Sequence, residues 1–343
     1  MTLKKPKIRT MEQLSATIGV SRPTLSKYFQ DPETVSKSSR SRIQTALDTV
    51  DYVPNYFATN LNRKSTGVVG IVVPYLTDPF FAEIARTVET RCIEEGLAPT
   101  LFSAHGRVDQ ENEILDTLRS MNAKGVLLAP LGRSSNRSRI ERFTDDIPTV
   151  LFDSNIDDVG AAFVGSDNFQ SVPAMVHYLA DGGEPPCLFE MKPVNPNANK
   201  RRAAYIKAME DAGHEPKIIR IEGDGWDFEQ IGYEQGKKAI QSGSLPSNTI
   251  FCSNDRLAIG FIAAAYELGH TVGREGATFR VAGHDDHPFS RFTCPALTTM
   301  AQDYKNIASH SVGTLVHMIE NGGPQGPREE VLFEGTLIKR ASA

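Results

Sequence analysis

The 343-residue chain contains little cysteine, a single tryptophan and no long apolar segment. Its four cysteines lie far apart without a C-x-x-C pair. Their spacing argues against disulfide bonds and a cysteine-based zinc site, and it favours a reducing cytoplasm as the setting. No apolar run reaches the roughly 18 residues that a membrane-spanning helix requires. The basic N-terminal stretch is not followed by the apolar core of a secretory signal, so we expect neither a membrane partner nor export.

The motifs of common cofactor sites are also missing. Neither G-x-G-x-x-G nor G-x-x-x-x-G-K-[ST] occurs, so the sequence predicts no dinucleotide and no nucleoside triphosphate. The segment GHDDH at 283–287 carries several possible metal ligands. Adjacent side chains of a strand point to opposite faces, which argues against their convergence on one ion. We therefore expect no cofactor, no metal and no enzymatic activity.

Charge is divided unevenly along the chain. Residues 1–66 hold eleven lysines and arginines against five acidic residues, whereas the remainder holds 26 against 37. This asymmetry favours a basic module for a polyanion joined to an acidic body with another task. A basic terminus that is merely solvated is the alternative.

The basic module has the pattern of short helices. Thr10 opens a capping box for a first helix that ends at Gly19, Ser21 can cap a second helix, and a third spans about 36–51. A helix, a tight glycine turn and a helix form the geometry that lays a second helix into the DNA major groove. A small helical bundle with a hydrophilic surface is the alternative. On the helix-turn-helix interpretation, the second helix supplies the predicted DNA contacts Ser21, Arg22, Pro23, Thr24, Ser26 and Lys27.

The segments that follow carry a resemblance. The chain has GVSRPTLSKYFQ at 19–30 and YVPNYFATNL at 52–61, and then DPFFAEI, VGSDN, SNDRLAIG, GHDD and PALTTMAQD in order. It resembles the LacI/GalR family of bacterial transcription regulators from about residue 10 to residue 340. The resemblance implies a sequence-specific DNA-binding regulator, in particular a repressor, that acts as a homodimer on double-stranded operator DNA.

The resemblance also implies a domain plan. A helix-turn-helix domain would span 8–53, a hinge 54–66 and an effector-binding and dimerisation body 67–343. In the hinge, Asn55 would contact DNA and Leu61 would wedge into the minor groove, although an ordinary buried linker leucine is the alternative.

The base sequence of the operator cannot be inferred from relatives, for two reasons. Lys27 replaces the usual arginine, and Arg22 and Pro23 occupy the positions expected to choose the operator sequence.

The body has the alternation of a parallel α/β architecture with two lobes. The apolar runs predict strands at 67–74, 99–104, 125–130, 148–153, 187–191, 217–223, 248–253 and 279–285. The amphipathic stretches predict helices at 80–95, 109–122, 169–181, 200–212, 229–242 and 255–268. The first lobe is expected at about 67–165 and 301–327, and the second at 166–300 and 328–343.

Polar residues at strand ends predict the ligand site, because open parallel sheets bind ligands beyond their carboxyl ends. Asp153, Asn254 and Asp285 are expected to contact a polyhydroxylated ligand, whereas Asp255 is expected to cap a helix. The resemblance implies a periplasmic-binding-protein-like body whose effector contacts are Phe80, Phe81, Asp153, Arg201, Trp226, Asn254, Asp285 and Gln302.

The sequence leaves several alternatives open. Trp226 is either a core residue or a platform for a sugar ring, and His284 stands at an aromatic position of the family, which predicts packing. A sugar or sugar derivative is the expected effector, with sugar phosphates, sugar acids and purines as alternatives. A transport-type sugar receptor without a DNA role would share the body but has no use for residues 1–66.

Overall fold

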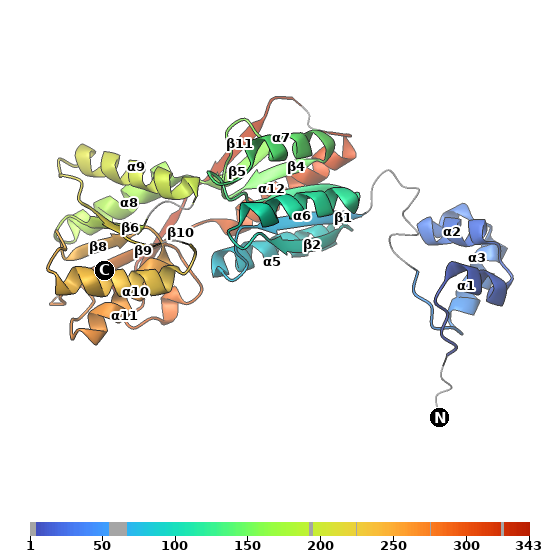
Figure 1. The fold of residues 1–343 in the computed structure, drawn as a ribbon, viewed down its shortest axis with the longest axis horizontal. Coiled ribbons are helices and arrows are strands. Elements are labelled where there is room, and N and C mark those ends of the chain that lie inside the picture. The colour runs from blue at the N-terminus through green and yellow to red at the C-terminus, as the bar shows by residue number, and fades with distance from the viewer. Residues whose placement is uncertain (1–4, 55–66, 192–194, 224, 275, 324–325) are drawn as a thin grey trace. The chain divides into compact units, whose positions relative to one another are not determined.

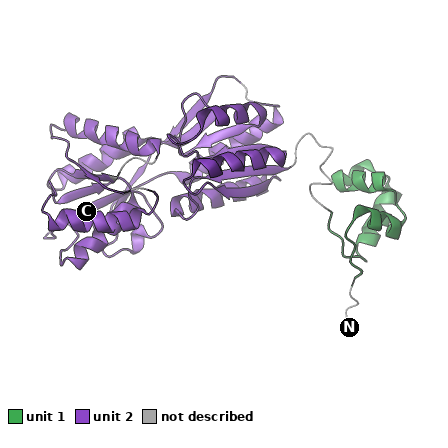
Figure 2. Ribbon diagram, in the orientation of Figure 1, with its two compact units in different colours: residues 1–66 green, residues 67–343 purple. Residues whose placement is uncertain are grey.

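The computed structural model describes residues 5–54, 67–191, 195–223, 225–274, 276–323 and 326–343. The chain divides between residues 66 and 67 into two compact units, which Figure 2 colours separately. The predicted contacts Asn55 and Leu61 and most of the predicted hinge lie outside the described residues.

Within unit 1, residues 1–66, the described part consists mainly of short helices that begin at side-chain caps. Thr10 Oγ1 accepts from the Gln13 amide at 3.1 Å, and Gln13 Oε1 accepts in turn from the Arg9 amide at 3.0 Å. Gly19, with φ of 66°, ends the first helix in the left-handed conformation that glycine tolerates. The elements are α1 (Met11–Ile18), α2 (Arg22–Gln30), η1 (Pro32–Thr34) and α3 (Lys37–Leu47).

The core of unit 1 lies between these helices. Its buried members are Leu14, Ile18, Val20, Leu25, Tyr28, Val35, Ile43 and Val50. From α2, Tyr28 is buried beside Leu25 whereas Phe29 is only half-buried, so the buried stripe of this helix follows the i, i+3 spacing. The Tyr28 hydroxyl donates to Gln44 Oε1 at 2.6 Å, which ties α2 to α3.

The first lobe of unit 2 is a parallel sheet covered on both faces. Its strand order is β11-β5-β4-β3-β1-β2. The strands are β1 (Val68–Val73), β2 (Ala98–Ser103), β3 (Gly125–Leu128), β4 (Thr149–Phe152), β5 (Ala162–Ser166) and β11 (Glu329–Phe333). Helices α5 (Pro79–Glu94) and α12 (Tyr304–Glu320) pack on one face, and α6 (Val108–Ser120) and α7 (Arg137–Asp146) on the other (Figure 1).

The second lobe repeats this plan with the order β12-β10-β9-β8-β6-β7. Its strands are β6 (Cys187–Met191), β7 (Ile218–Ile221), β8 (Thr249–Cys252), β9 (Arg280–Asp285), β10 (Thr298–Ala301) and β12 (Thr336–Ile338), of which β12 pairs antiparallel with β10. Helices α8 (Asn168–Asp181) and α9 (Pro196–Asp211) cover one face, and α10 (Phe228–Gln241) and α11 (Asp255–Glu267) the other. Among the residues described, no helix is both long and apolar enough to cross a bilayer.

The chain crosses between the lobes after β5, after β10 and after β11. The predicted assignment of 328–343 to the second lobe is wrong for its first part, because β11 pairs with β5 in the first sheet and only β12 returns to the second. The elements α7, α12, β5, β10, β11 and β12 were not among the predicted segments. β11 is a short, largely exposed edge strand without the apolar run that marked the interior strands.

Close contact between α10 and α11 depends on glycine. A Cβ at Gly260 would lie 2.1 Å from the Glu229 carbonyl oxygen and 2.6 Å from the Tyr233 nitrogen. Backbone atoms of a packed helix cannot shift independently, so the two helices would separate.

Gly260→Ala should lower the free energy of unfolding of unit 2 by about 2 kcal/mol or more, because overpacking forces the helices apart. Urea unfolding followed by the fluorescence of Trp226, the chain's single tryptophan, measures this unit. The matched control is Gly313→Ala in α12, where nothing lies within 4 Å of the new Cβ. That change should stabilise by roughly 0.5 kcal/mol. Equal effects of the two substitutions would contradict the account.

Candidate functional site

Helix α2 buries one face and exposes another. Leu25 and Tyr28 are buried, whereas Arg22, Pro23 and Lys27 are exposed and Ser26 is half-buried. The exposed face therefore carries cations and a hydroxyl group, as a helix that enters the major groove requires.

The first turn of α2 is fixed by hydroxyl groups. The Ser21 Oγ caps the helix by accepting from the Thr24 amide at 3.4 Å, and the two hydroxyl oxygens lie 2.8 Å apart. These predicted DNA contacts therefore already have a structural task.

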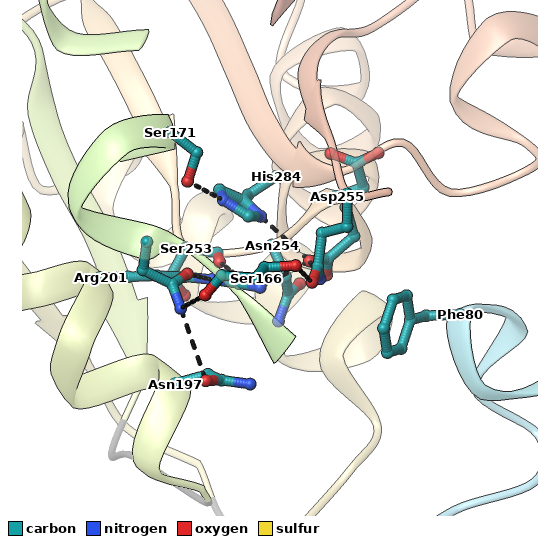
Figure 3. A network of polar contacts seen from close by, with 12 residues as sticks. Phe80, Ser166, Ser171, Asn197, Arg201, Ser253, Asn254, Asp255 and His284 are labelled. Carbon is teal, nitrogen blue, oxygen red and sulfur yellow. Dashed lines mark hydrogen bonds and ion pairs between the residues drawn. The ribbon is translucent and has the colours of Figure 1, made fainter. Parts of the chain in front are cut away.

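A cavity lies between the two lobes of unit 2. It includes every residue predicted to contact the effector, and its lining is Asp78, Phe80, Phe81, Asp153, Asn195, Asn197, Ala198, Arg201, Trp226, Phe228, Ser253, Asn254, Asp285 and Gln302. In Figure 3 the Phe80 ring faces the polar cluster of the second lobe from the side of the first. The structure thus brings together residues that are up to about 220 positions apart in the chain.

Asp285, at the end of β9, is the centre of the polar cluster. Its Oδ1 accepts from Arg201 Nη2 and from Gln302 Nε2, each at 2.7 Å, and from His284 Nδ1 at 3.1 Å. Burial favours a raised pKa, but the Arg201 charge and the donated hydrogen bonds lower the pKa of Asp285 to about 2. The residue is held at φ of 115°, a strained conformation that its partners fix.

Arg201, on α9, is committed to protein partners through all three of its nitrogens. Nε donates to Asn168 Oδ1 at 3.1 Å, Nη1 to the Ser253 carbonyl at 2.8 Å, and Nη2 to Asp285. The residue is only 7% exposed. Its guanidinium is therefore rigid, and its charge is balanced within the protein (Figure 3).

Asp153 follows β4 and has a weaker set of partners. Its Oδ1 and its carbonyl oxygen accept from Asn197 Nδ2 at 3.2 and 3.0 Å. Burial, with smaller contributions from Asp285 and Asp78, raises the pKa of Asp153 to about 7, against the lowering effect of Arg201. The cavity thus holds a carboxyl group that titrates near neutral pH.

An ion pair that the sequence did not predict joins the lobes. Asp78 caps α5 by accepting from the Phe80 amide at 3.1 Å, and its other oxygen lies 3.2 Å from Arg256 Nη1 on α11. Arg256 also binds Glu229 at 2.6 Å and lies over the Phe228 ring at 5.1 Å. Burial raises the pKa of Asp78 to about 6 although Arg256 opposes it. An Asp-Pro pair at a helix start and an Asn-Asp-Arg run were the available signals.

The helix-capping role predicted for Asp255 belongs to its neighbour Asn254. Asn254 caps α11, because its Oδ1 accepts from the Leu257 amide at 2.8 Å. Asp255 is fully buried and instead accepts from the hydroxyls of Ser290 at 2.6 Å and Thr299 at 2.5 Å. The prediction that Asp255 caps the helix is therefore wrong, and Asn254 does so while it also lines the cavity.

Aromatic rings form the apolar part of the wall. Trp226 stacks on Tyr75 with ring centroids 5.8 Å apart and planes 4° apart, and it lies 6.4 Å from Phe81 and 5.8 Å from Phe228. It packs against the cores of both lobes and also lines the cavity. The two interpretations of Trp226 are therefore compatible.

His284 supports Asp285 from within the core. It is 1% exposed, and its Nε2 lies 3.2 Å from Ser171 Oγ. Burial and the nearby Arg201 charge lower the pKa of His284 to about 4, so the neutral ring donates through Nδ1 to Asp285. Among the described residues, no group of three side chains is arranged to hold a metal ion.

Comparisons with known proteins find a matching family for part of each unit. Residues 10–55 match the family described as bacterial regulatory proteins, lacI family, and residues 179–343 match the periplasmic binding protein-like domain. The ribose operon repressor of Escherichia coli (strain K12) is 26% identical over 336 residues, which cover 97% of this chain and 99% of that protein. The transcriptional repressor PurR of Histophilus somni (strain 129Pt) is 26% identical, covering 96% and 98%.

A solved structure has the same fold along the whole chain. The Lac repressor dimer bound to operator and the anti-inducer ONPF has a TM-score of 0.81 at 22% identity, covering 98% of this chain and 99% of that one.

Asp153→Asn should change how stability depends on pH. The pKa of Asp153 is about 7 in the folded protein, whereas its ordinary value of 3.8 applies in the unfolded chain. Between pH 3.8 and 7 the folded state therefore binds a proton that the unfolded state has lost. The stability that this group contributes is therefore lost as pH rises, by up to about 1.4 kcal/mol per pH unit. Since asparagine does not titrate, the variant should gain melting temperature relative to the wild type between pH 5 and 8. Parallel curves for the two proteins would contradict this, and Asp181→Asn, on an exposed residue, is the control.

Proposed function

The chain belongs to the LacI/GalR family of bacterial regulatory proteins, and we propose that it represses transcription from an operator while an effector between the lobes of unit 2 controls its DNA affinity. The observation that carries the proposal is the union of two sites in one chain. One is a helix-turn-helix with an exposed cationic face, and the other is a polar cavity lined from both lobes. The relatives are repressors and not enzymes.

On the DNA side, α2 is the recognition helix. Arg22 would contact base edges, Lys27 would contact phosphates, and Ser21, Pro23, Thr24 and Ser26 would fit the helix to the groove. We assign the DNA-binding domain to residues 8–53. We assign the hinge, in which Asn55 and Leu61 would make further DNA contacts, to residues 54–66. Such a protein works in the cytoplasm, where its operator is.

A homodimer is the working form. One small module contacts too little DNA, whereas two read a pseudo-palindrome. The Lac repressor structure is a dimer on its operator. In this chain Phe289 is 61% and Phe292 78% exposed on unit 2, and such neighbouring apolar side chains suit burial against a second copy.

Control by the effector follows from its position between the lobes. The contacts Arg256–Asp78 and Asn197–Asp153 cross the cavity, so a ligand that alters them changes how the lobes close. Coupling between sites needs only a differential affinity for two states, typically 1–3 kcal/mol.

Two substitutions on α2 distinguish the contribution of base contacts to DNA affinity from that of phosphate contacts. Arg22→Ala should weaken a selected operator about tenfold to a hundredfold and change random DNA much less, because base-edge contacts carry 1–3 kcal/mol. Lys27→Ala should weaken both DNAs alike and reduce the salt slope of log K by about one. Fluorescence anisotropy over a salt series, with an operator selected from genomic fragments, measures both.

The control is Lys207→Ala, which removes an exposed charge from unit 2. If Lys207→Ala weakens binding as much as Lys27→Ala, or if the wild type prefers no fragment, the proposal is wrong.

A further inference from the structure

The charge balance of the cavity narrows the class of effector, given the proposed function. The lining contains three carboxyl groups, Asp78, Asp153 and Asp285, but only one guanidinium, that of Arg201. A site for a phosphate or a carboxylate normally presents an uncompensated cation or a helix N-terminus. The N-termini of α5, α9 and α11 also reach this lining, but side-chain oxygens of Asp78, Asn195 and Asn254 already cap them. The lining therefore presents more acidic than basic groups.

The cations near the cavity are already committed. Arg201 directs its charge at Asp285, with 2.7 Å between Nη2 and Oδ1. Arg256, behind the lining, binds both Asp78 and Glu229. The Lys200 ammonium lies over the Phe163 ring, 5.4 Å from its centroid, and is not part of the lining. An anionic effector would have to displace one of these partners.

Asp153 is the carboxyl group of the lining that no guanidinium contacts directly in the described structure. Its side chain accepts a hydrogen bond from the neutral amide of Asn197, whereas Asp78 and Asp285 each pair directly with a guanidinium; the Arg201 charge acts on Asp153 through space. The side chain is 4% exposed, so solvent screens it poorly. When ionised it repels an anion, and in either protonation state it can form a hydrogen bond with a hydroxyl group.

The remainder of the lining suits a neutral ring. Asn254 and Asn195 each use the side-chain oxygen to cap a helix, which leaves their amide NH₂ groups as neutral donors. Phe80, Phe81 and Trp226 supply flat apolar faces. A sugar ring has an apolar C–H face and several hydroxyl groups, each of which both donates and accepts.

We propose that the effector is an uncharged sugar and that Asp153 excludes its phosphorylated and carboxylated derivatives. Hydroxyl groups of the sugar bind the carboxyls of Asp153 and Asp285, and its C–H face packs on the aromatic wall. Arg201 positions Asp285 and does not receive an anion.

Matched sets of compounds test this with the full-length wild-type protein. The sets are D-ribose with ribose 5-phosphate, D-glucose with glucose 6-phosphate and D-glucuronate, and D-galactose with D-galacturonate. Thermal shift identifies binders, because a ligand of the folded state raises the melting temperature, and calorimetry then gives Kd. At pH 8.5, which is above the pKa of Asp153 and leaves its carboxyl group ionised, at least one neutral sugar should bind, with its anionic derivatives at least tenfold weaker.

Asp153→Asn assigns the selectivity to a residue. Asparagine preserves the shape and the capacity for hydrogen bonds but removes the charge, so at pH 8.5 the ratio between the affinities for the neutral sugar and its anionic derivative should fall about tenfold. Asp181→Asn, which removes an exposed charge from the end of α8, should leave the ratio unchanged.

The outcomes are distinct. An anionic derivative that binds the wild type more tightly than its parent sugar, or a panel in which no neutral sugar binds, overturns the inference. An unchanged ratio in Asp153→Asn overturns the role of Asp153. None of these results bears on operator binding, which the anisotropy measurement tests separately. The inference can therefore fail while the proposed function stands.

Discussion

The three hydrogen bonds received by one oxygen of Asp285 are the interaction on which the organisation of unit 2 depends. A buried carboxylate is stable only when charge and hydrogen bonds replace the water that it has lost. Its donors come from α9, from β9 and from the crossover after β10. Gln302, one of these donors, also accepts from Ser166, at the crossover after β5. The ligand cavity and two of the segments that connect the lobes therefore share one network.

This shared network gives the fold a physical route for control by a ligand. A hydroxyl group placed at Asp285 competes with or reinforces the bonds from Arg201 and Gln302, and Gln302 belongs to a segment that must bend when the lobes move. Across the cavity, the Arg256–Asp78 ion pair and the Asn197–Asp153 bonds oppose opening. Buried ion pairs gain little net stability but strongly favour one geometry over another. Two discrete arrangements of the lobes are thus more natural here than a continuous range.

How much the sequence predicted depends on the range of each interaction. Alternating apolar runs and amphipathic stretches predicted the parallel α/β class, and polar residues at strand ends predicted three residues that line the cavity, Asp153, Asn254 and Asp285. The other predicted effector contacts came from the family resemblance. Local pattern could not tell Asn254 from Asp255, because the choice between a cap and a buried acceptor depends on the hydroxyls of Ser290 and Thr299, more than 30 residues away. The Arg256–Asp78 pair, with partners 178 residues apart, and the pairing of β11 with β5 were missed for the same reason.

The overall charge of the body does not decide what enters the cavity. Residues 67–343 carry 37 acidic against 26 basic side chains, a balance that is unfavourable for contact with DNA phosphates. These surface charges are screened over about 8 Å at physiological ionic strength, so a small metabolite inside the cavity scarcely senses them. Buried groups are screened far less, and of the three carboxyl groups that line the cavity Asp153 is the one whose hydrogen-bond donor is a neutral amide. Selection among charged and uncharged effectors therefore has to be local, at a single carboxyl group whose partner is an amide where its neighbours have guanidinium groups.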